Sequence, residues 1–457
     1  MSLTDAAPAE AARAAKNASH IMATLSADQR NDALLSMHKA LAANRESILA
    51  ANAEDLALAQ DDAAQGRLNP SLVSRLDLGR KGKWEDMLQG ILDVRDLPDP
   101  VGRVTLRTRL DDGLELERVT CPIGVLLVIF EARPEVLANI AALAVKSGNA
   151  ALLKGGKEST KTMLAMATVL AQSLEGDSSS VPPAAIQLVT RRDVIQELLV
   201  LDRDIDLVVP RGSNELVRSI KAGTRIPVLG HADGICSTFI DAGFTDASLA
   251  ATILVDAKTG YPAACNSLET LLVHESVIAD AASAGTAAFV AAAKALLAAG
   301  VTLRCDAPSK AVLDQQLDEG ARAKVVDAVN DDYDTEFLSL DLAVKVLPSL
   351  DAAIAHINAH GSHHTDAILT HSEANAEKFM AAVDSAGVYW NASTRFADGM
   401  RYGFGTEVGI STNKIHSRGP VGLEGLTIYK YKLRGSGQAA GAYGEGKKQY
   451  KHESLSL

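Results

Sequence analysis

Few features of this sequence are typical of a secreted, membrane-bound or nucleic-acid-binding protein. Its 457 residues include only four cysteines, none in C-x-x-C spacing, which excludes a disulfide framework and a zinc ribbon. Acidic residues outnumber basic ones by 57 to 45, and the net charge of −12 disfavours binding to nucleic acid or to an anionic membrane. No apolar secretory signal follows the N-terminus. We therefore expect a cytoplasmic protein.

Long apolar runs are also scarce. The most membrane-like stretch, residues 281–301, is mostly alanine and contains Ser283 and Lys294, so a buried helix is the better interpretation. Hydrophobic residues still make up 47% of the chain, which is enough for two or three domains with sizeable cores.

The hydrophobic pattern changes along the chain. Residues 1 to about 100 have the spacing of Ala- and Leu-rich helices, with no strand pattern. Alternating segments on either side of Asp112 and Gly113 predict a β-hairpin. Residues 121–241 and 257–388 then alternate between short apolar runs and helical patterns, which predicts an α/β protein with a doubly wound sheet and a second α/β block. The expected strands are 123–130, 151–154, 186–189, 206–209 and 226–229 in the first region, and 268–274, 301–305, 342–347 and 366–370 in the second.

The last part of the chain has a different character. Residues 426–433 alternate like an exposed or edge strand. Residues 436–457 are small, polar and basic, and we expect them to form a mobile tail.

Cys265, in KTGYPAACNSLET, is a candidate nucleophile because cysteine is strongly nucleophilic when a loop favours its thiolate. By itself, this pattern is more typical of a buried structural cysteine. The remaining cysteines stand in or beside strand patterns and indicate core positions: Cys121, Cys236 and Cys305.

Two weaker patterns suggest ligand sites. Gly212 and Ser213 lie at a strand-to-helix turn that could hold a phosphate, although no G-x-G-x-x-G fingerprint is present. The segment HINAHGSHHTDAILTH holds five histidines, of which His356 and His360 could face a metal from one helix. Without H-E-x-x-H or a nearby cysteine, we expect no metal site there and favour a turn with surface or substrate-facing histidines.

Several long segments match one family in consistent order over roughly residues 5–435. They are FEARPEV, IPVLGHADGICSTFID, YPAACNSLETLLVH, HGSHHTD, NASTRFADG and EVGISTNKIHSRGPVGLEGLTIYKY. These segments resemble the gamma-glutamyl phosphate reductases, also called glutamate-5-semialdehyde dehydrogenases, of the aldehyde dehydrogenase superfamily.

The resemblance implies a three-part architecture. Its parts are an NADP-binding domain (1–102 and 121–256), a catalytic domain with Cys265 (257–388) and an oligomerisation flap (103–120 and 413–435). Residues 389–412 form a return segment to the cofactor domain, and the tail (436–457) lies outside the match. The resemblance further implies a homo-oligomer, either a dimer or a tetramer, whose flap pairs with a neighbouring subunit.

The implied reaction belongs to proline biosynthesis. NADPH reduces L-glutamyl 5-phosphate to L-glutamate 5-semialdehyde with release of phosphate, through a thioester on Cys265 that accepts hydride. A separate glutamate 5-kinase would supply the labile acyl phosphate and is a candidate partner.

Two departures from the wider superfamily bear on this chemistry. Hydrolytic members carry a water-activating glutamate in E-L-G-G, whereas Val228 stands at that position in V-L-G-H, which suits an enzyme that exchanges its acyl group with phosphate. The asparagine that holds the oxyanion in the superfamily aligns with Ala132, so the Cys265 amide and Asn266 are the expected donors.

The resemblance also assigns cofactor residues. Lys154 and Lys157 replace the K-x-x-E pair on the adenosine ribose, and a lysine in place of the glutamate favours the 2′-phosphate of NADP. A solvated lysine at a helix start is the competing interpretation of Lys157. Ser213 matches the residue that contacts the pyrophosphate, and Glu336 matches the residue that holds the nicotinamide ribose.

The anionic substrate calls for arginine clamps, for which we expect Arg133 and Arg395, ahead of Arg401, with His364 at the glutamyl end. Which arginine takes the phosphate and which the carboxylate stays open. Two alternative functions also stay open at this point: a hydrolytic NAD(P)-dependent aldehyde dehydrogenase and a non-catalytic oligomeric scaffold of the same fold.

Overall fold

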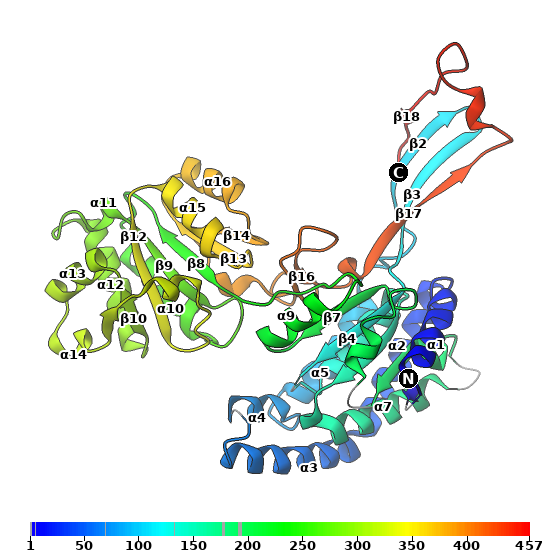
Figure 1. The fold of residues 1–457 in the computed structure, drawn as a ribbon, viewed down its shortest axis with the longest axis horizontal. Helices are drawn as coiled ribbons and strands as arrows, with labels where there is room; N and C mark the ends of the chain where they lie inside the picture. The colour runs from blue at the N-terminus through cyan, green and yellow to red at the C-terminus, as the bar shows by residue number, and fades with distance from the viewer. Residues whose placement is uncertain (1, 5, 69, 132, 176–178, 191–193) are drawn as a thin grey trace. The chain divides into compact units, whose positions relative to one another are not determined.

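The computed structural model describes residues 2–4, 6–68, 70–131, 133–175, 179–190 and 194–457 (Figure 1). The chain forms two compact units. Unit 1 consists of Met1–Gly230, Phe404–Gly409 and Val421–Leu457, and unit 2 consists of His231–Gly403 and Ile410–Pro420.

Unit 1 contains a five-stranded parallel sheet in the order β1-β6-β5-β4-β7. All six side chains of β4 are buried, as its unbroken apolar run predicts for an inner parallel strand. The short β1 pairs with β6, so the prediction that no strand lies in the first hundred residues is wrong. The strands are β1 (Ser2–Thr4), β4 (Val125–Phe130), β5 (Ala150–Gly155), β6 (Ile186–Val189) and β7 (Leu207–Arg211).

The helices of unit 1 begin where the sequence provides caps and apolar periodicity. Ser26, for example, accepts a hydrogen bond from the amide of Gln29 and starts the second helix with a capping box. The helices are α1 (Pro8–Met22), α2 (Ala27–Ala43), α3 (Arg45–Ala64), α4 (Pro70–Leu76), α5 (Lys83–Asp96), α6 (Val136–Lys146), α7 (Thr160–Leu174), α8 (Ile195–Leu198) and α9 (Asn214–Gly223).

Unit 2 contains a seven-stranded parallel sheet in the order β11-β10-β12-β9-β8-β13-β14. Its strands are β8 (Cys236–Ile240), β9 (Leu268–His274), β10 (Thr302–Cys305), β11 (Val325–Asp327), β12 (Asp341–Leu347), β13 (Thr365–Leu369) and β14 (Gly387–Trp390). Its helices are α10 (Ala247–Thr259), α11 (Glu275–Ile278), α12 (Ala284–Ala298), α13 (Ala307–Gln316), α14 (Glu319–Arg322), α15 (Leu350–His360) and α16 (Glu373–Ala382).

The helix α12 is the Ala-rich segment singled out above, and its many buried side chains confirm that it is a core helix. Within the residues that the structure describes, no helix has the length and apolarity needed to cross a membrane.

The unit boundaries differ from the expected ones. Strand β8 pairs with β9 and β13, so it and α10 belong to the second sheet, although we expected the cofactor domain to reach residue 256. The expected strand at 226–229 is a single bridge at Val228, because Pro227 has no amide hydrogen to extend the ladder. Ile410–Pro420 also falls in unit 2, so residues 413–420 are not part of the flap.

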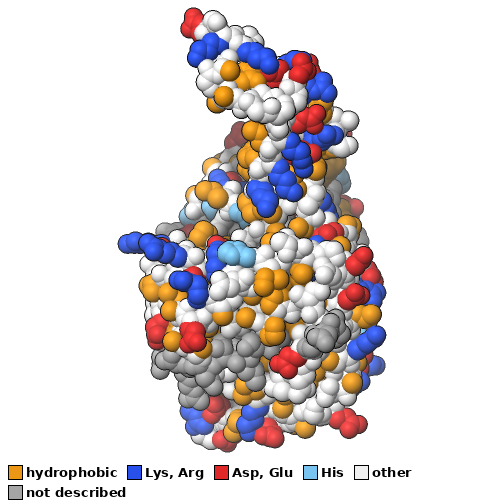
Figure 2. Space-filling model, turned by 90° about the vertical axis from the view of Figure 1, so that its right-hand side faces the viewer, with side chains coloured by type: hydrophobic (Ala, Val, Ile, Leu, Met, Phe, Trp, Pro, Cys, Tyr) orange, Lys and Arg blue, Asp and Glu red, His pale blue; other side chains and the backbone are white. Residues whose placement is uncertain are grey.

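A separate four-stranded antiparallel sheet in unit 1 has the order β17-β3-β2-β18. It confirms the predicted hairpin, whose turn contains Gly113 in the left-handed region at φ 66°. Acidic and basic side chains intermingle on its surface, as the upper part of Figure 2 shows. The strands are β2 (Val104–Asp111), β3 (Leu114–Pro122), β17 (Thr427–Arg434) and β18 (Glu453–Ser454), and a further two-stranded sheet joins β15 (Gly409–Ser411) to β16 (Gly419–Val421).

The C-terminal residues 436–457 fold back onto this sheet, so the prediction of a mobile tail is wrong. Strand β18 pairs with β2, and the hydroxyl of Tyr443 donates to the carboxylate of Asp111 over 2.8 Å. Lys448 also contacts Asp111, and these hydrogen bonds lower the pKa of that carboxyl to about 2. The polar composition of the tail could not indicate these contacts, because the partner residues belong to a hairpin that is far away in the sequence.

Candidate active site

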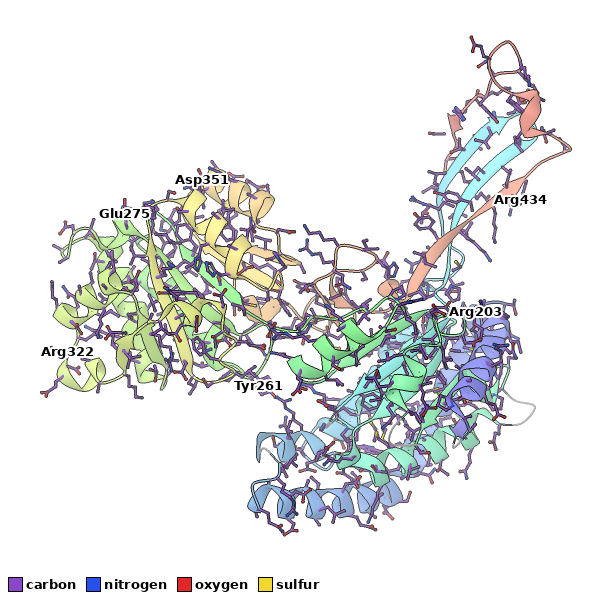
Figure 3. All side chains as sticks on the ribbon, viewed as in Figure 1. Arg203, Tyr261, Glu275, Arg322, Asp351 and Arg434 are labelled. Atoms are coloured by element: carbon purple, nitrogen blue, oxygen red, sulfur yellow. The ribbon has the colours of Figure 1, made fainter. Side chains whose placement is uncertain are left out.

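Cys265 lies in a loop of unit 2 between the end of α10 and the start of β9. Two backbone hydrogen bonds fold the loop, from Ala264 to the carbonyl of Tyr261 (3.0 Å) and from Ser267 to the carbonyl of Ala264 (2.8 Å). The loop leaves Cys265 half-buried and Tyr261, labelled in Figure 3, 39% exposed. A thiol in this position is accessible to a small molecule.

Glycine at position 234 allows a close backbone approach behind the cysteine. A Cβ added to Gly234 would lie closer than 3.0 Å to the backbone of Cys265. The thiol of Cys236 donates to the carbonyl of Cys265 over 3.3 Å. The segment that enters β8 therefore fixes the main chain of Cys265.

A buried ion pair closes the base of the loop. Lys258 and Glu269 are both fully buried, and their charged groups are 2.6 Å apart. Burial raises the pKa of Glu269 to about 7, against the opposing effect of Lys258. Because Lys258 lies in the last turn of α10 and Glu269 belongs to β9, the pair joins the two elements between which the loop runs.

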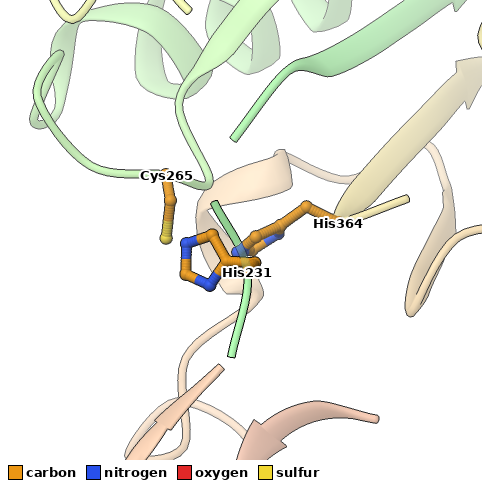
Figure 4. A group of neighbouring side chains, drawn as sticks. All are labelled: His231, Cys265 and His364. Atoms are coloured by element: carbon orange, nitrogen blue, oxygen red, sulfur yellow. The ribbon is translucent and has the colours of Figure 1, made fainter. Parts of the chain in front are cut away.

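Three neighbouring strands bring Cys265 and two histidines together. Cys265, His231 and His364 precede β9, β8 and β13, which are adjacent and parallel in the order β9-β8-β13. One ligand atom from each lies within 4.8 Å of the others, and the imidazole rings are 5.1 Å apart, edge to face (Figure 4). A ring nitrogen of His231 points toward the sulfur (Figure 4). The site thus lies at the amino ends of these strands.

Both histidines are held through Nδ1. In His231 this nitrogen donates to the carbonyl of Ile410 over 3.1 Å, and in His364 it is 2.9 Å from the hydroxyl of Thr365. The Nε2 atom of His364 is buried and has no hydrogen-bond partner among the described residues. The sequence predicted His364 at the site but gave no role to His231, whose approach depends on strand pairing.

The histidine-rich segment does not form one cluster. His364 joins Cys265, whereas His356 and His360 lie on α15 with ring centres 4.3 Å apart, and His371 stacks on Phe244.

Arg395 and Asn266 also belong to this part of unit 2. Within the described part of the chain, the buried Nε atom of Arg395 has no hydrogen-bond partner. It lies near Gly260, where an added Cβ would be 3.7 Å from it. Burial and the charge of Arg401 lower the pKa of Arg395. The amide nitrogen of Asn266 donates to the carbonyl of Ala397 over 2.9 Å, so this side chain tethers the cysteine loop to the turn that holds Arg395. Glu336 is half-buried in the same unit, where its charge contributes to the raised pKa of Glu269.

The predicted adenosine residues lie in unit 1. Lys154 and Lys157 line a cavity of about 280 Å³ at the carboxyl ends of β4, β5 and β6, which is the usual edge for nucleotide ligands in parallel sheets. Lys157 is exposed and Lys154 is half-buried. Two ammonium groups at such a cavity fit the phosphates of a dinucleotide.

Ser213 and Arg133 occupy other positions in unit 1. Ser213 caps α9, and its amide donates to the carboxylate of Glu131 over 3.1 Å, so an anionic group already lies at this helix start. Arg133 is half-buried near Lys83. Ala132, where the superfamily has its oxyanion asparagine, lies outside the described residues.

Comparison with known proteins decides the family. The model of the aldehyde dehydrogenase family matches residues 2–331. The chain belongs to the aldehyde dehydrogenase family. It is 53% identical to a probable gamma-glutamyl phosphate reductase of Schizosaccharomyces pombe, over 98% of this chain and 97% of that protein.

Solved structures agree with this assignment. The crystal structure of gamma-glutamyl phosphate reductase from Thermotoga maritima has a TM-score of 0.86 and 33% identity, with 95% of this chain and all of that chain covered. The structure of a glyceraldehyde-3-phosphate dehydrogenase of Methanocaldococcus jannaschii complexed with NADP has a TM-score of 0.60 at 18% identity, over 94% of each chain. At this identity, the match shows only that the two proteins share a fold. These matches confirm the resemblance noted in the sequence and the aldehyde dehydrogenase-like α/β fold. Members of this family act on small molecules with nicotinamide cofactors and are typically oligomeric.

Replacement of Gly234 tests how the cysteine is held. In Gly234→Ala the new methyl group would overlap the backbone of Cys265 and displace the sulfur. Misplacement of a reacting group by about 1 Å costs roughly 100-fold in rate, so we expect a loss of that order in kcat with the fold retained. Gly441→Ala, at a position with open space around it, is the control. Equal activity of the two variants would contradict the proposed contact.

The ion pair makes a separate prediction for stability. Lys258→Met leaves a buried carboxylate uncompensated and should lower the free energy of unfolding by about 3–5 kcal/mol. The double variant Lys258→Met with Glu269→Leu removes both charges and should regain most of that loss. Urea unfolding of the wild type and the two variants measures both effects. A double variant no more stable than the single one would contradict this account.

Proposed function

We propose that this protein reduces L-glutamyl 5-phosphate to L-glutamate 5-semialdehyde and phosphate with NADPH, as a step of proline biosynthesis in the cytoplasm. The observation that carries the proposal is the accessible thiol of Cys265, which faces His231 and His364 and lies in the same unit as the unsatisfied Nε of Arg395. The relative from Schizosaccharomyces pombe, which matches nearly the whole chain, bears the name of this enzyme.

The chemistry follows from the thiol. Sγ of Cys265 attacks the acyl carbon of the acyl phosphate, the C–O bond to phosphate breaks, and a thioester forms. Bound NADPH supplies the hydride that reduces the thioester carbon. Cleavage of the C–S bond then releases the aldehyde and returns the thiolate. The backbone amide of Cys265 donates to the developing oxyanion. We expect a smaller contribution from Asn266, because its amide nitrogen already binds Ala397.

Charged groups account for substrate selection. Arg395 has a buried donor without a partner, which an anionic oxygen of the substrate would satisfy. Arg133 binds the other anionic end of the substrate, and His364 contacts the glutamyl group. Val228 in place of the usual glutamate removes the base that would activate water against the thioester. The acyl group is thereby kept for reduction.

Cofactor recognition rests on the cavity of unit 1. Lys154 and Lys157 hold the 2′-phosphate and the adenosine ribose of NADP. Ser213 contacts the pyrophosphate after the carboxylate of Glu131 moves away from the N-terminus of α9. Glu336 accepts hydrogen bonds from the nicotinamide ribose.

Assembly follows from the exposed strand β17. Its residues from Ile428 onward are exposed, including Ile428, Tyr429, Tyr431 and Leu433, and it lies at the edge of its sheet. An edge strand that exposes apolar and aromatic side chains between its basic ones has free main-chain groups for pairing, so we propose a homo-oligomer formed through this sheet, as a dimer or a tetramer. A separate glutamate 5-kinase, as the source of the labile acyl phosphate, is the proposed partner.

The reverse reaction tests the proposed function. Purified protein is mixed with pyrroline-5-carboxylate and NADP, with and without inorganic phosphate, and cofactor reduction is followed by absorbance. We expect reduction that requires phosphate and disappears in Cys265→Ala, while Cys121→Ser, a half-buried cysteine of β3, behaves as the wild type. Reduction without phosphate would instead show that water takes the acyl group.

A charge reversal tests cofactor choice. Lys157→Glu places a carboxylate at the cavity and should lower the ratio of kcat/KM for NADPH to that for NADH by about 10-fold or more. Lys161→Glu makes the same charge change on α7 at a residue that pairs with Glu54, and should leave the ratio nearly unchanged. An unchanged ratio in Lys157→Glu would argue that Lys157 is merely solvated.

A further inference from the structure

The group around Cys265 has the composition of a metal site. It contains one thiol sulfur and two imidazole nitrogens, all within 4.8 Å of one another (Figure 4). Two imidazoles and a thiolate form a donor set that Zn²⁺ prefers over Mg²⁺ or Ca²⁺. Bond lengths of about 2.0–2.3 Å to zinc would require these atoms to close by small side-chain rotations.

The hydrogen bonds behind the histidines orient both rings for this role. Nδ1 of His231 must carry a hydrogen, because it bonds to the carbonyl of Ile410, and the lone pair of the neutral ring is therefore on Nε2. The hydroxyl of Thr365 lies 2.9 Å from Nδ1 of His364 and can accept a hydrogen bond from it, which would leave the lone pair of that ring on Nε2. In metal proteins, such bonds to the outer ring nitrogen fix the tautomer and orientation of ligating histidines.

His364 provides an independent indication of a ligand. Its side chain is only 1% exposed, and none of the residues that the structure describes forms a hydrogen bond with its Nε2. Buried polar atoms are rarely left unsatisfied. The nearest carboxylate in sequence, that of Asp366, already accepts hydrogen bonds from the amide of Ser237 and the hydroxyl of Ser385. A soft cation that binds sulfur and nitrogen is therefore better suited to this group than a hard one.

We propose that Cys265, His231 and His364 form an inhibitory site for Zn²⁺ or a similar divalent cation. The cation binds the two neutral imidazoles and the sulfur, a metal–sulfur bond replaces the S–H bond, and the thiol proton leaves to solvent. No oxidation or reduction takes place. The bound sulfur no longer attacks an acyl carbon, so the cation blocks the enzyme reversibly. Metal binding stands on the geometry alone, whereas its inhibitory consequence rests on the proposed function.

Cobalt is a direct probe of the site. Co²⁺ added to the chelator-treated full chain should give thiolate-to-cobalt absorption in the near ultraviolet, saturating at about one equivalent per chain. The absorption should be lost in Cys265→Ser and in His364→Ala, and Zn²⁺ should displace it. Cys121→Ser and His360→Ala, which alter a thiol and an imidazole elsewhere, should keep it. No absorption in the wild type, or equal absorption in Cys265→Ser, would overturn the proposal.

A milder variant guards against misfolding of His364→Ala. Thr365→Val keeps the shape of the side chain but removes the hydrogen bond to His364. Loss of such an outer contact typically costs roughly 10–100-fold in metal affinity. We expect a weakening in that range, and an affinity identical to that of the wild type would count against His364 as a ligand.

Two further measurements separate this proposal from the proposed function. Zn²⁺ at micromolar concentration should slow alkylation of Cys265 by iodoacetamide at least 10-fold, followed by mass spectrometry, and a chelator should restore the rate. The same concentration should inhibit the phosphate-dependent reaction. If Zn²⁺ protects Cys265 from alkylation but the metal-free protein has no reductase activity, the metal site is supported and the proposed function is refuted. Full activity and full alkylation at saturating Zn²⁺ would refute the metal site.

Discussion

The order β9-β8-β13 in the sheet of unit 2 is the constraint on which the site depends. Neighbouring parallel strands start at the same edge of a sheet, so the residues just before them meet. Cys265, His231 and His364 occupy these three positions. If β8 did not lie beside β9, the residues that precede these two strands would not meet. The chemistry therefore depends on a strand order, which in turn depends on the burial of β8 between two apolar partners.

Close packing converts this order into a defined geometry. Gly234 has no side chain, so the approach to β8 can lie against the main chain of Cys265. The buried ion pair between Lys258 and Glu269 joins the two elements on either side of the loop. The two side chains of a buried ion pair stay together, because separating their charges in the protein interior costs much free energy. Together these contacts leave the sulfur little freedom.

Two of the buried polar atoms without a hydrogen-bond partner belong to residues of the candidate site. Among the residues that the structure describes, nothing bonds to Nε2 of His364 or to Nε of Arg395 in unit 2. In unit 1, the carboxylate of Glu131 lies at the start of α9, where an anionic ligand would be favoured. The two unsatisfied nitrogens of unit 2 make the ligand-free protein less stable than a fully paired one, and a ligand that satisfies them gains binding energy.

The sequence by itself determined most of the elements, the family and the residue that we propose as the nucleophile. Apolar runs located β4, β6, β9 and β13, the Asp112–Gly113 turn located the hairpin, and long segments in register identified the family and Cys265. These features depend on residues that are close together in the sequence, or on motifs that are continuous in the sequence. The tertiary structure alone decided that β8 belongs to the second sheet, that His231 faces Cys265, and that the tail packs on β2. Hydrophobic periodicity tells which face of an element is buried, but the partner of that face is set by packing between segments far apart in the chain.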